Sequence, residues 1–112
     1  MSIESYELKI AQIAKRHLPD TVDEEIKSYL KGLPSDISQN GLLQTMTFIK
    51  GKGEGKYAIL YNIFDEFFHE HFENRPLLTT LLSLDDMQKY HFYQRGFLAY
   101  AIWLKRLVLA LR

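Results

Sequence analysis

Histidines and carboxylates are the first side chains to consider for chemistry, because the chain has four histidines and no cysteine. His69-Glu70-His71 is the densest group of possible metal ligands. Residues two apart on a helix point in different directions, whereas paired ligands on a helix need steps of three or four. Asp65 and His69 have that spacing, but no third ligand is indicated. We therefore predict no metal site and interpret the group as solvated surface.

A glycine and lysine segment at residues 50–56 resembles a phosphate-binding loop, since its glycines free backbone amides for an anion. The match fails because only three residues separate its outer glycines, and Tyr57 replaces the hydroxyl that would bind magnesium. What remains is a flexible basic loop with two open interpretations. It is either an ordinary solvated turn, or a contact for nucleic-acid phosphates through Lys50, Lys52 and Lys56.

Other catalytic arrangements are missing from the sequence. No serine has the flanking residues of a nucleophile elbow, and the acid pairs Asp65/Glu66 and Asp85/Asp86 are adjacent, so on a helix they diverge. The aromatic residues between positions 57 and 72 have the spacing of a buried stripe and are interpreted as core. We predict a protein that is not an enzyme and needs no cofactor.

The C-terminal segment has the strongest binding signal. Residues 57–86 carry a net charge of minus five, whereas residues 87–112 contain five cations and no acid. On one long helix Arg95 and Arg106 point the same way, because eleven residues make almost three turns, and Lys105 aligns with Arg112 beside them. The helix dipole explains cations only in the last turn, and Arg95 lies beyond it. This basic band predicts contact with phosphates or with an acidic protein.

Helical periodicity dominates the elements that must position these residues. Pro19 ends the first helix, Thr21 is predicted to cap the second, and Gly32 with Pro34 is predicted to close it. Ser83, three residues before Asp86, is predicted to cap the last helix, whose single Gly96 permits close packing. The expected helices are residues 3–18, 21–32, 57–74, 76–82 and 86–112.

Residues 35–49 are ambiguous. Thr45-Met46-Thr47-Phe48 alternates like a strand, which could pair with residues 57–61 in a β-hairpin, but the apolar positions of the segment also fit a helix. The helical pattern of residues 57–74 weakens the hairpin. We predict an all-α fold, a compact single-domain bundle of five to six helices over residues 1–112 with a long C-terminal helix.

Composition and length set the class of the protein. A chain of 112 residues with 46% hydrophobic residues can bury the core of one domain. The absence of cysteine suits a reducing compartment. No apolar run approaches the roughly 20 residues of a membrane span, and residues 1–10 lack the pattern of a signal peptide. The expected location is cytoplasmic, with no membrane partner.

Two motifs in order carry a family resemblance. Residues 90–98, followed by Trp103-Leu104-Lys105-Arg106, resemble the C-terminal signature of the small subunit of the type III-B CRISPR complex. Leu33-Pro34, Ile37, Asn40-Gly41-Leu42, Phe48 and Lys50 resemble the central motif of that family. His91 and Gln94 depart from the pattern, because we would expect an arginine and a threonine there.

The resemblance implies a helical bundle that does not cut RNA but stacks along a Cmr effector complex in antiviral defence. Its implied partners are the large subunit, the backbone subunits, further copies of itself, guide RNA and target RNA. Carried over by residue, Trp103 and Leu104 would pack, as would Asn40, Gly41, Leu42 and Tyr90, while Lys105 and Arg106 would face phosphate or a neighbouring subunit. The alternative is a purely protein-binding helical adaptor with no RNA contact.

Overall fold

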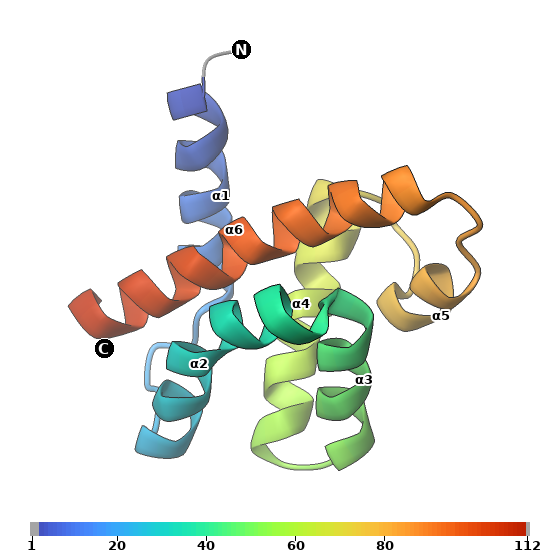
Figure 1. Cartoon of the computed structure of the whole chain (residues 1–112). Coiled ribbons are helices and arrows are strands. Elements are labelled where there is room, and N and C mark those ends of the chain that lie inside the picture. Colours follow the sequence, from blue (N-terminus) through green and yellow to red (C-terminus); the bar gives the residue numbers. More distant parts are fainter. Residues whose placement is uncertain (1–2, 112) are drawn as a thin grey trace.

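The computed structural model describes the backbone of residues 3–111 and the side chains of residues 6–111. That part of the chain contains six helices and no strand, so the all-α prediction is confirmed (Figure 1). Whether the whole chain unfolds as one domain stays a prediction. The helices are α1 (Ile3–His17), α2 (Glu24–Asn40), α3 (Leu42–Lys52), α4 (Lys56–His71), α5 (Leu77–Leu82) and α6 (Met87–Leu111).

The start of α2 differs from the prediction. Asp23, not Thr21, is the N-cap, and its carboxylate accepts a hydrogen bond of 2.9 Å from the backbone N–H of Ile26. Aspartate is a strong N-cap residue because its charge also complements the helix dipole. The last helix shows the same preference, since Asp86 rather than Ser83 accepts the 2.9 Å bond from the N–H of Gln88.

The predicted end of α2 at Gly32 and Pro34 is wrong, because the helix continues through Pro34 to Asn40. An interior proline removes one backbone hydrogen bond and costs about 3 kcal/mol. Ile37, one turn beyond it, is 0% exposed, and full burial of an isoleucine stabilises by about 1.5–3 kcal/mol. Burial of this last turn therefore offsets the proline, and the helix ends only at Gly41, whose φ is +89°.

The ambiguous residues 35–49 divide between the end of α2 and α3, so the β-hairpin alternative is wrong. Leu42, Met46 and Ile49 are 0% exposed and lie at helical steps on one face. The helix ends at Gly53, which has the left-handed conformation that favours glycine, with φ +76°. The helical periodicity was therefore the correct interpretation, because one face packs against α4.

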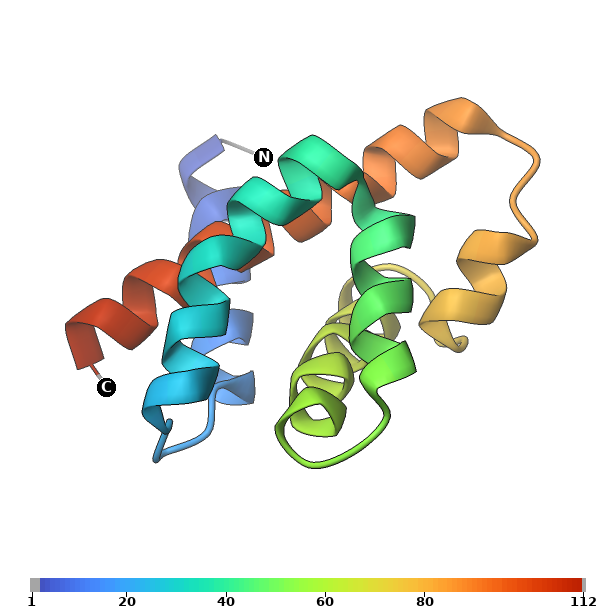
Figure 2. The same ribbon diagram turned by 60° about the horizontal axis from the view of Figure 1, so that its bottom comes forward.

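The helices form two groups joined by α6. Figures 1 and 2 show α6 crossing α1 and α2, while α3 and α4 lie together with α5 beside them. The interface between α4 and α6 is largely aromatic. The rings of Phe67 and Tyr100 stack with centroids 4.0 Å apart, and the rings of Phe67 and Phe97 meet edge to face at 5.1 Å. The interpretation of the aromatic series as core is confirmed for Phe64, Phe67 and Phe68, each 0% exposed.

Gly96 allows a close approach within this aromatic interface. A Cβ atom at Gly96 would lie 2.4 Å from Cζ of Phe72, far closer than a normal contact. The expectation that this glycine permits close packing inside α6 is confirmed. For the part of the chain that the structure covers, no helix is long and apolar enough to cross a membrane.

Candidate nucleic-acid interface

The cations of α6 lie on its outer side. Arg95 and Arg106 are exposed and Lys105 is half-buried, while Arg112 lies outside the described residues. The guanidinium carbon of Arg106 lies 5.4 Å from the Trp103 ring, a cation–π distance. Among residues 6–111, no carboxylate forms an ion pair with Arg95, Lys105 or Arg106. Their positive charges are therefore not neutralised by any described side chain.

The neighbouring side chains hold α6 in place. Leu104 is 0% exposed, and Trp103 is half-buried against the core. Burial raises the pKa of the Tyr6 hydroxyl, and the charge of Arg95 opposes this shift. The arginines thus project from a helix that packs on α1 and α2.

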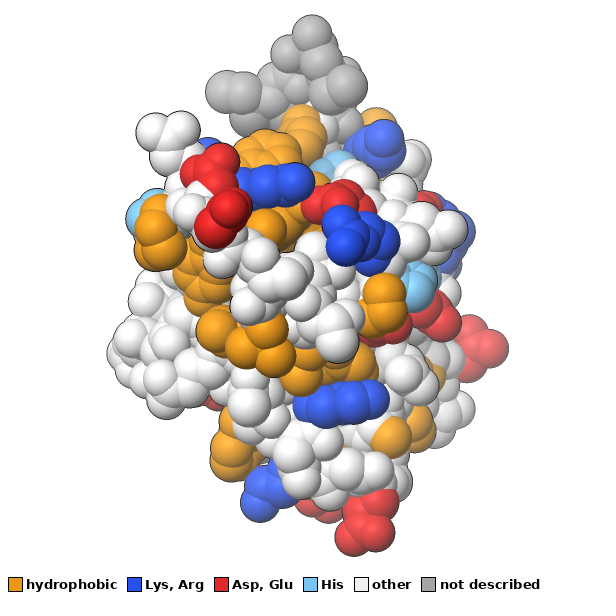
Figure 3. Space-filling view, turned by 90° about the vertical axis from the view of Figure 1, so that its right-hand side faces the viewer, with side chains coloured by type: hydrophobic (Ala, Val, Ile, Leu, Met, Phe, Trp, Pro, Cys, Tyr) orange, Lys and Arg blue, Asp and Glu red, His pale blue; other side chains and the backbone are white. Residues whose placement is uncertain are grey.

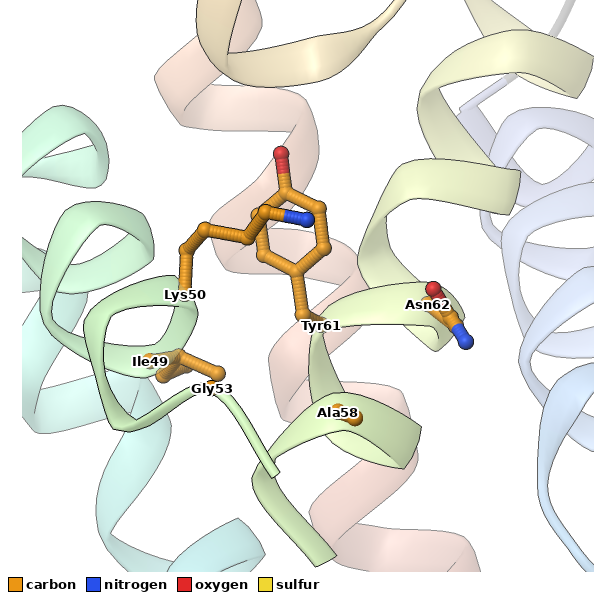
Figure 4. Close-up of a pocket in the computed structure, with 6 residues that line it drawn as sticks. All are labelled: Ile49, Lys50, Gly53, Ala58, Tyr61 and Asn62. Atoms are coloured by element: carbon orange, nitrogen blue, oxygen red, sulfur yellow. The ribbon is translucent and has the colours of Figure 1, made fainter. Parts of the chain in front are cut away.

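The lysines of the loop fall into two kinds. Figure 4 shows Lys50 reaching over the ring of Tyr61, with Nζ 4.6 Å from the ring centroid, and Nζ of Lys52 lies 5.2 Å from the Phe48 ring. Lys56 instead lies 2.6 Å from a carboxylate oxygen of Glu25. That hydrogen bond raises the pKa of Lys56, and the carboxylate neutralises its charge, so Lys56 is the weakest cation of the three for binding phosphate.

The structure does not bring the loop lysines and the α6 cations into one continuous band. α3 begins beside α6 and runs away from it, so the turn between α3 and α4 lies on the far side of the molecule (Figures 1 and 2). Lys50 and Lys52 form one basic group at that turn. Arg95, Lys105 and Arg106 form the other, on α6.

Tyr90 and Gln94 have a role that the sequence analysis did not find. The N–H of Leu42 donates a 2.9 Å hydrogen bond to Oε1 of Gln94, and the N–H of Leu43 donates a 2.9 Å bond to the hydroxyl of Tyr90. The two side chains satisfy backbone donors at the start of α3, where Gly41 supplies no side-chain cap. The central and C-terminal motifs therefore contact each other directly. The sequence signal for this contact was the glycine at the N-cap position of α3, because a glycine has no side chain to cap the helix.

Gly41 is required at this contact for two reasons. Its φ of +89° disfavours other residues, and a Cβ atom there would lie 3.3 Å from the Tyr90 hydroxyl oxygen. Asn40 is exposed beside it, and Leu42 is fully buried. The Asn40-Gly41-Leu42 motif thus turns the chain between α2 and α3 while allowing α6 to approach.

Three of the four histidines are half-buried, and His91 is exposed. The interpretation of residues 69–71 as solvated surface is therefore wrong for His71, which packs on an aromatic ring. Nε2 of His69 lies 3.6 Å from Oδ2 of Asp65. His71 stacks on Phe67 with centroids 5.1 Å apart, and burial lowers the pKa of His71. Nδ1 of His17 lies 3.0 Å from the buried Tyr100 hydroxyl. No group of three possible metal ligands occurs among the described residues.

An apolar groove lies between α5 and the start of α6, with a volume of about 310 Å³. Leu82 is 68% exposed and Met87 65% exposed on its rim, and Figure 3 shows hydrophobic side chains gathered on this face. Adjacent exposed apolar side chains of this size are typical of protein contacts. The groove is lined by Leu43, Leu81, Leu82, Leu84, Asp86, Met87 and Tyr90.

Comparison with known proteins identifies a family. The model of a family described as CRISPR-associated protein (Cas_Cmr5) matches residues 5–111. The matched range includes both motifs and every helix from α2 to α6. The search of curated proteins and the search of solved structures each found no match.

Proposed function

The chain belongs to the Cas_Cmr5 family, the small subunits of type III-B CRISPR complexes, and we propose that it contacts RNA backbone and neighbouring subunits without cutting RNA. In this role it stacks along the effector complex in the cytoplasm and serves antiviral defence. The large subunit, the backbone subunits and further copies of this chain are its protein partners, and guide and target RNA are its nucleic-acid partners.

The observation that carries the RNA contact is the charge of three cations of α6, Arg95, Lys105 and Arg106, which form no ion pair within residues 6–111. Lys89 on the same helix is instead paired with Glu73. Arg95 and Arg106 are exposed on a rigid helix, and no acid occurs from residue 87 to the end of the chain. Cations held in this way release counterions when they meet phosphates, which gives binding that depends on salt and little on sequence. Lys50 and Lys52 supply a second, separate contact for the same kind of backbone.

The groove between α5 and α6 supports the contact with protein subunits. Leu82 and Met87 expose apolar side chains that remain in water in the isolated chain. Covering them in a complex removes this apolar area from water, which is favourable at about 25 cal/mol per Å². The groove lies at the start of α6, whereas Lys105 and Arg106 lie near its end, so one subunit could contact RNA and a neighbouring protein at the same time.

A charge reversal tests the RNA contact. Lys105→Glu with Arg106→Glu is expected to weaken binding of target RNA by the assembled complex and to lower the slope of log affinity against log salt by about 1 for each phosphate that the variant no longer binds. The matched control is Lys15→Glu with Lys31→Glu, which reverses two exposed lysines on α1 and α2. If both double variants bind RNA and assemble like the wild type, the α6 site is wrong.

The same experiment separates the adaptor alternative. A purely protein-binding subunit would lose assembly in the Lys105/Arg106 variant, while RNA bound by the complexes that do form would be unchanged. Ultraviolet crosslinking in the assembled wild-type complex gives an independent result. Uracil crosslinks within residues 87–111 would contradict the protein-only function, and crosslinks confined to other subunits would contradict the RNA contact.

A further inference from the structure

Figure 2 shows α2 and α3 diverging from the point where they meet. A second groove, with a volume of about 240 Å³, is lined by residues of these two helices. Unlike the apolar groove beside α5, it combines aromatic rings with short polar side chains. Its lining residues are Tyr29, Asp36 and Asn40 from α2 and Gln44, Thr45 and Phe48 from α3. This composition differs from that of a protein-docking groove and suits a flat polar ligand.

One wall of the groove offers an exposed aromatic ring with a cation over one of its faces. Phe48 is 52% exposed although its ring is large and apolar. Nζ of Lys52, one helical turn further along α3, lies 5.2 Å from the centroid of that ring. An exposed ring next to a lysine is the arrangement by which proteins stack a base and hold the phosphate of the same nucleotide.

The remaining walls carry hydrogen-bond donors and acceptors that can recognise the edge of a base. The half-buried Asp36 supplies acceptors only, whereas the amides of Asn40 and Gln44 supply both donors and acceptors. Thr45 is 5% exposed, and its hydroxyl oxygen has no hydrogen-bond partner. Burial, followed by the charge of Asp36, raises the pKa of Tyr29 to about 12, so its hydroxyl keeps its proton.

We propose that the α2/α3 groove binds one unpaired base of RNA, preferentially guanine, stacked on Phe48 with its phosphate near Lys52. Guanine presents two adjacent donors, N1–H and the N2 amino group, to the carboxylate of Asp36, and its O6 accepts from an amide of Asn40 or Gln44. Uracil has a single donor and leaves the carboxylate partly unsatisfied. This inference rests on the proposed RNA contact and adds base recognition to it.

The test compares two single-stranded probes by fluorescence anisotropy with the full chain: ten uridines, and the same strand with one central guanosine. We expect the guanosine probe to bind several-fold more tightly. Phe48→Ala should lower the affinity for the guanosine probe about tenfold, within the range of one base–aromatic stack. Phe48→Trp should retain that affinity. Ile59→Ala, an exposed apolar residue on α4 at 45% exposure, is the matched control.

Asp36→Asn tests the reading of the base. It should abolish the preference for guanosine and leave the affinity for the all-uridine probe unchanged. If both probes bind equally, and Phe48→Ala changes neither, while Lys105→Glu with Arg106→Glu weakens both, then the groove inference is wrong and the proposed RNA contact stands.

Binding of a free nucleotide distinguishes failure of the groove inference from failure of the proposed RNA contact. Guanosine monophosphate, followed by NMR, should shift the side-chain amide signals of Asn40 and Gln44 more than uridine monophosphate does. Absence of any shift, together with absence of RNA binding, would overturn both the groove and the proposed function. A shift without binding of either RNA probe would make the groove a site for free nucleotides and overturn its assignment to RNA.

Discussion

Replacing Gly96 by alanine tests how α4 and α6 pack. The added Cβ would lie 2.4 Å from Cζ and 3.1 Å from Cε2 of Phe72. The ring must therefore move by about 1 Å to restore an ordinary carbon–carbon separation. Its neighbours resist this movement, since Phe72 contacts Tyr93 at 5.0 Å and Phe67 at 5.7 Å between ring centroids.

Two opposing effects decide the magnitude. Overpacking a core costs about 1–3 kcal/mol, while alanine in place of glycine inside a helix stabilises by about 1 kcal/mol. We expect Gly96→Ala to lower the free energy of unfolding by about 1 kcal/mol. Gly32→Ala is the matched control, because Gly32 is exposed inside α2 and a Cβ there meets nothing within 4 Å. The control should gain about 0.5–1 kcal/mol.

The difference between these two variants isolates the steric cost, because both gain the same helix propensity. Urea unfolding should separate them by about 1–3 kcal/mol, the overpacking cost. Adding Phe72→Leu to Gly96→Ala should remove the difference, since the shorter side chain no longer reaches the new methyl group. Equal stabilities of Gly96→Ala and Gly32→Ala would refute the close approach of Phe72.

Three further outcomes are expected. Gln94→Ala should destabilise the protein by about 1 kcal/mol and speed amide hydrogen exchange at Leu42, because the Leu42 N–H loses its acceptor. Gln94→Glu keeps an acceptor and should leave the stability almost unchanged. Equal exchange rates in the wild type and both variants would contradict the cap. Burial lowers the pKa of His71 from its ordinary 6.5, so the unfolded chain binds the proton more readily. Wild-type stability should therefore fall as the pH is lowered from about 7 to about 5. His71→Leu should flatten that slope; an unchanged slope would exclude His71 as its source. Glu70 has a lowered pKa, so its contribution is lost only as the pH falls below its ordinary 4.5. Leu82→Lys should weaken assembly with the other subunits without changing the unfolding free energy, as measured by size-exclusion chromatography and denaturation, and intact assembly would exclude the α5/α6 groove as a contact.

Local sequence patterns were sufficient for much of the fold. A helix repeats every 3.6 residues, so the buried faces of α4 and α6 are visible in the spacing of their apolar residues. The same spacing placed Phe64, Phe67 and Phe68 in the core. The charge asymmetry, the absence of thiols and the need for a small residue at Gly96 are likewise properties of residues close together in the chain. Local patterns do not predict the arrangement of the candidate site, because its groups come from segments that are distant in the sequence.

Helix ends and side-chain partners depended on the tertiary structure. Pro34 stays inside α2 because Ile37 is buried by other helices, an energy that no local pattern contains. Lys56 is neutralised by Glu25, which lies 31 positions away in the sequence.

The contacts of Gln94 and the groove beside Phe48 also depend on tertiary packing. Gln94 caps α3 across 52 positions. The groove exists only because α2 and α3 diverge at Gly41. Helical periodicity reports the neighbours within about one turn of each residue, and therefore predicts which helices form and which faces they bury. Packing alone selects which distant residues meet, and so decides which cations are free, which helix ends are capped and where a ligand can enter.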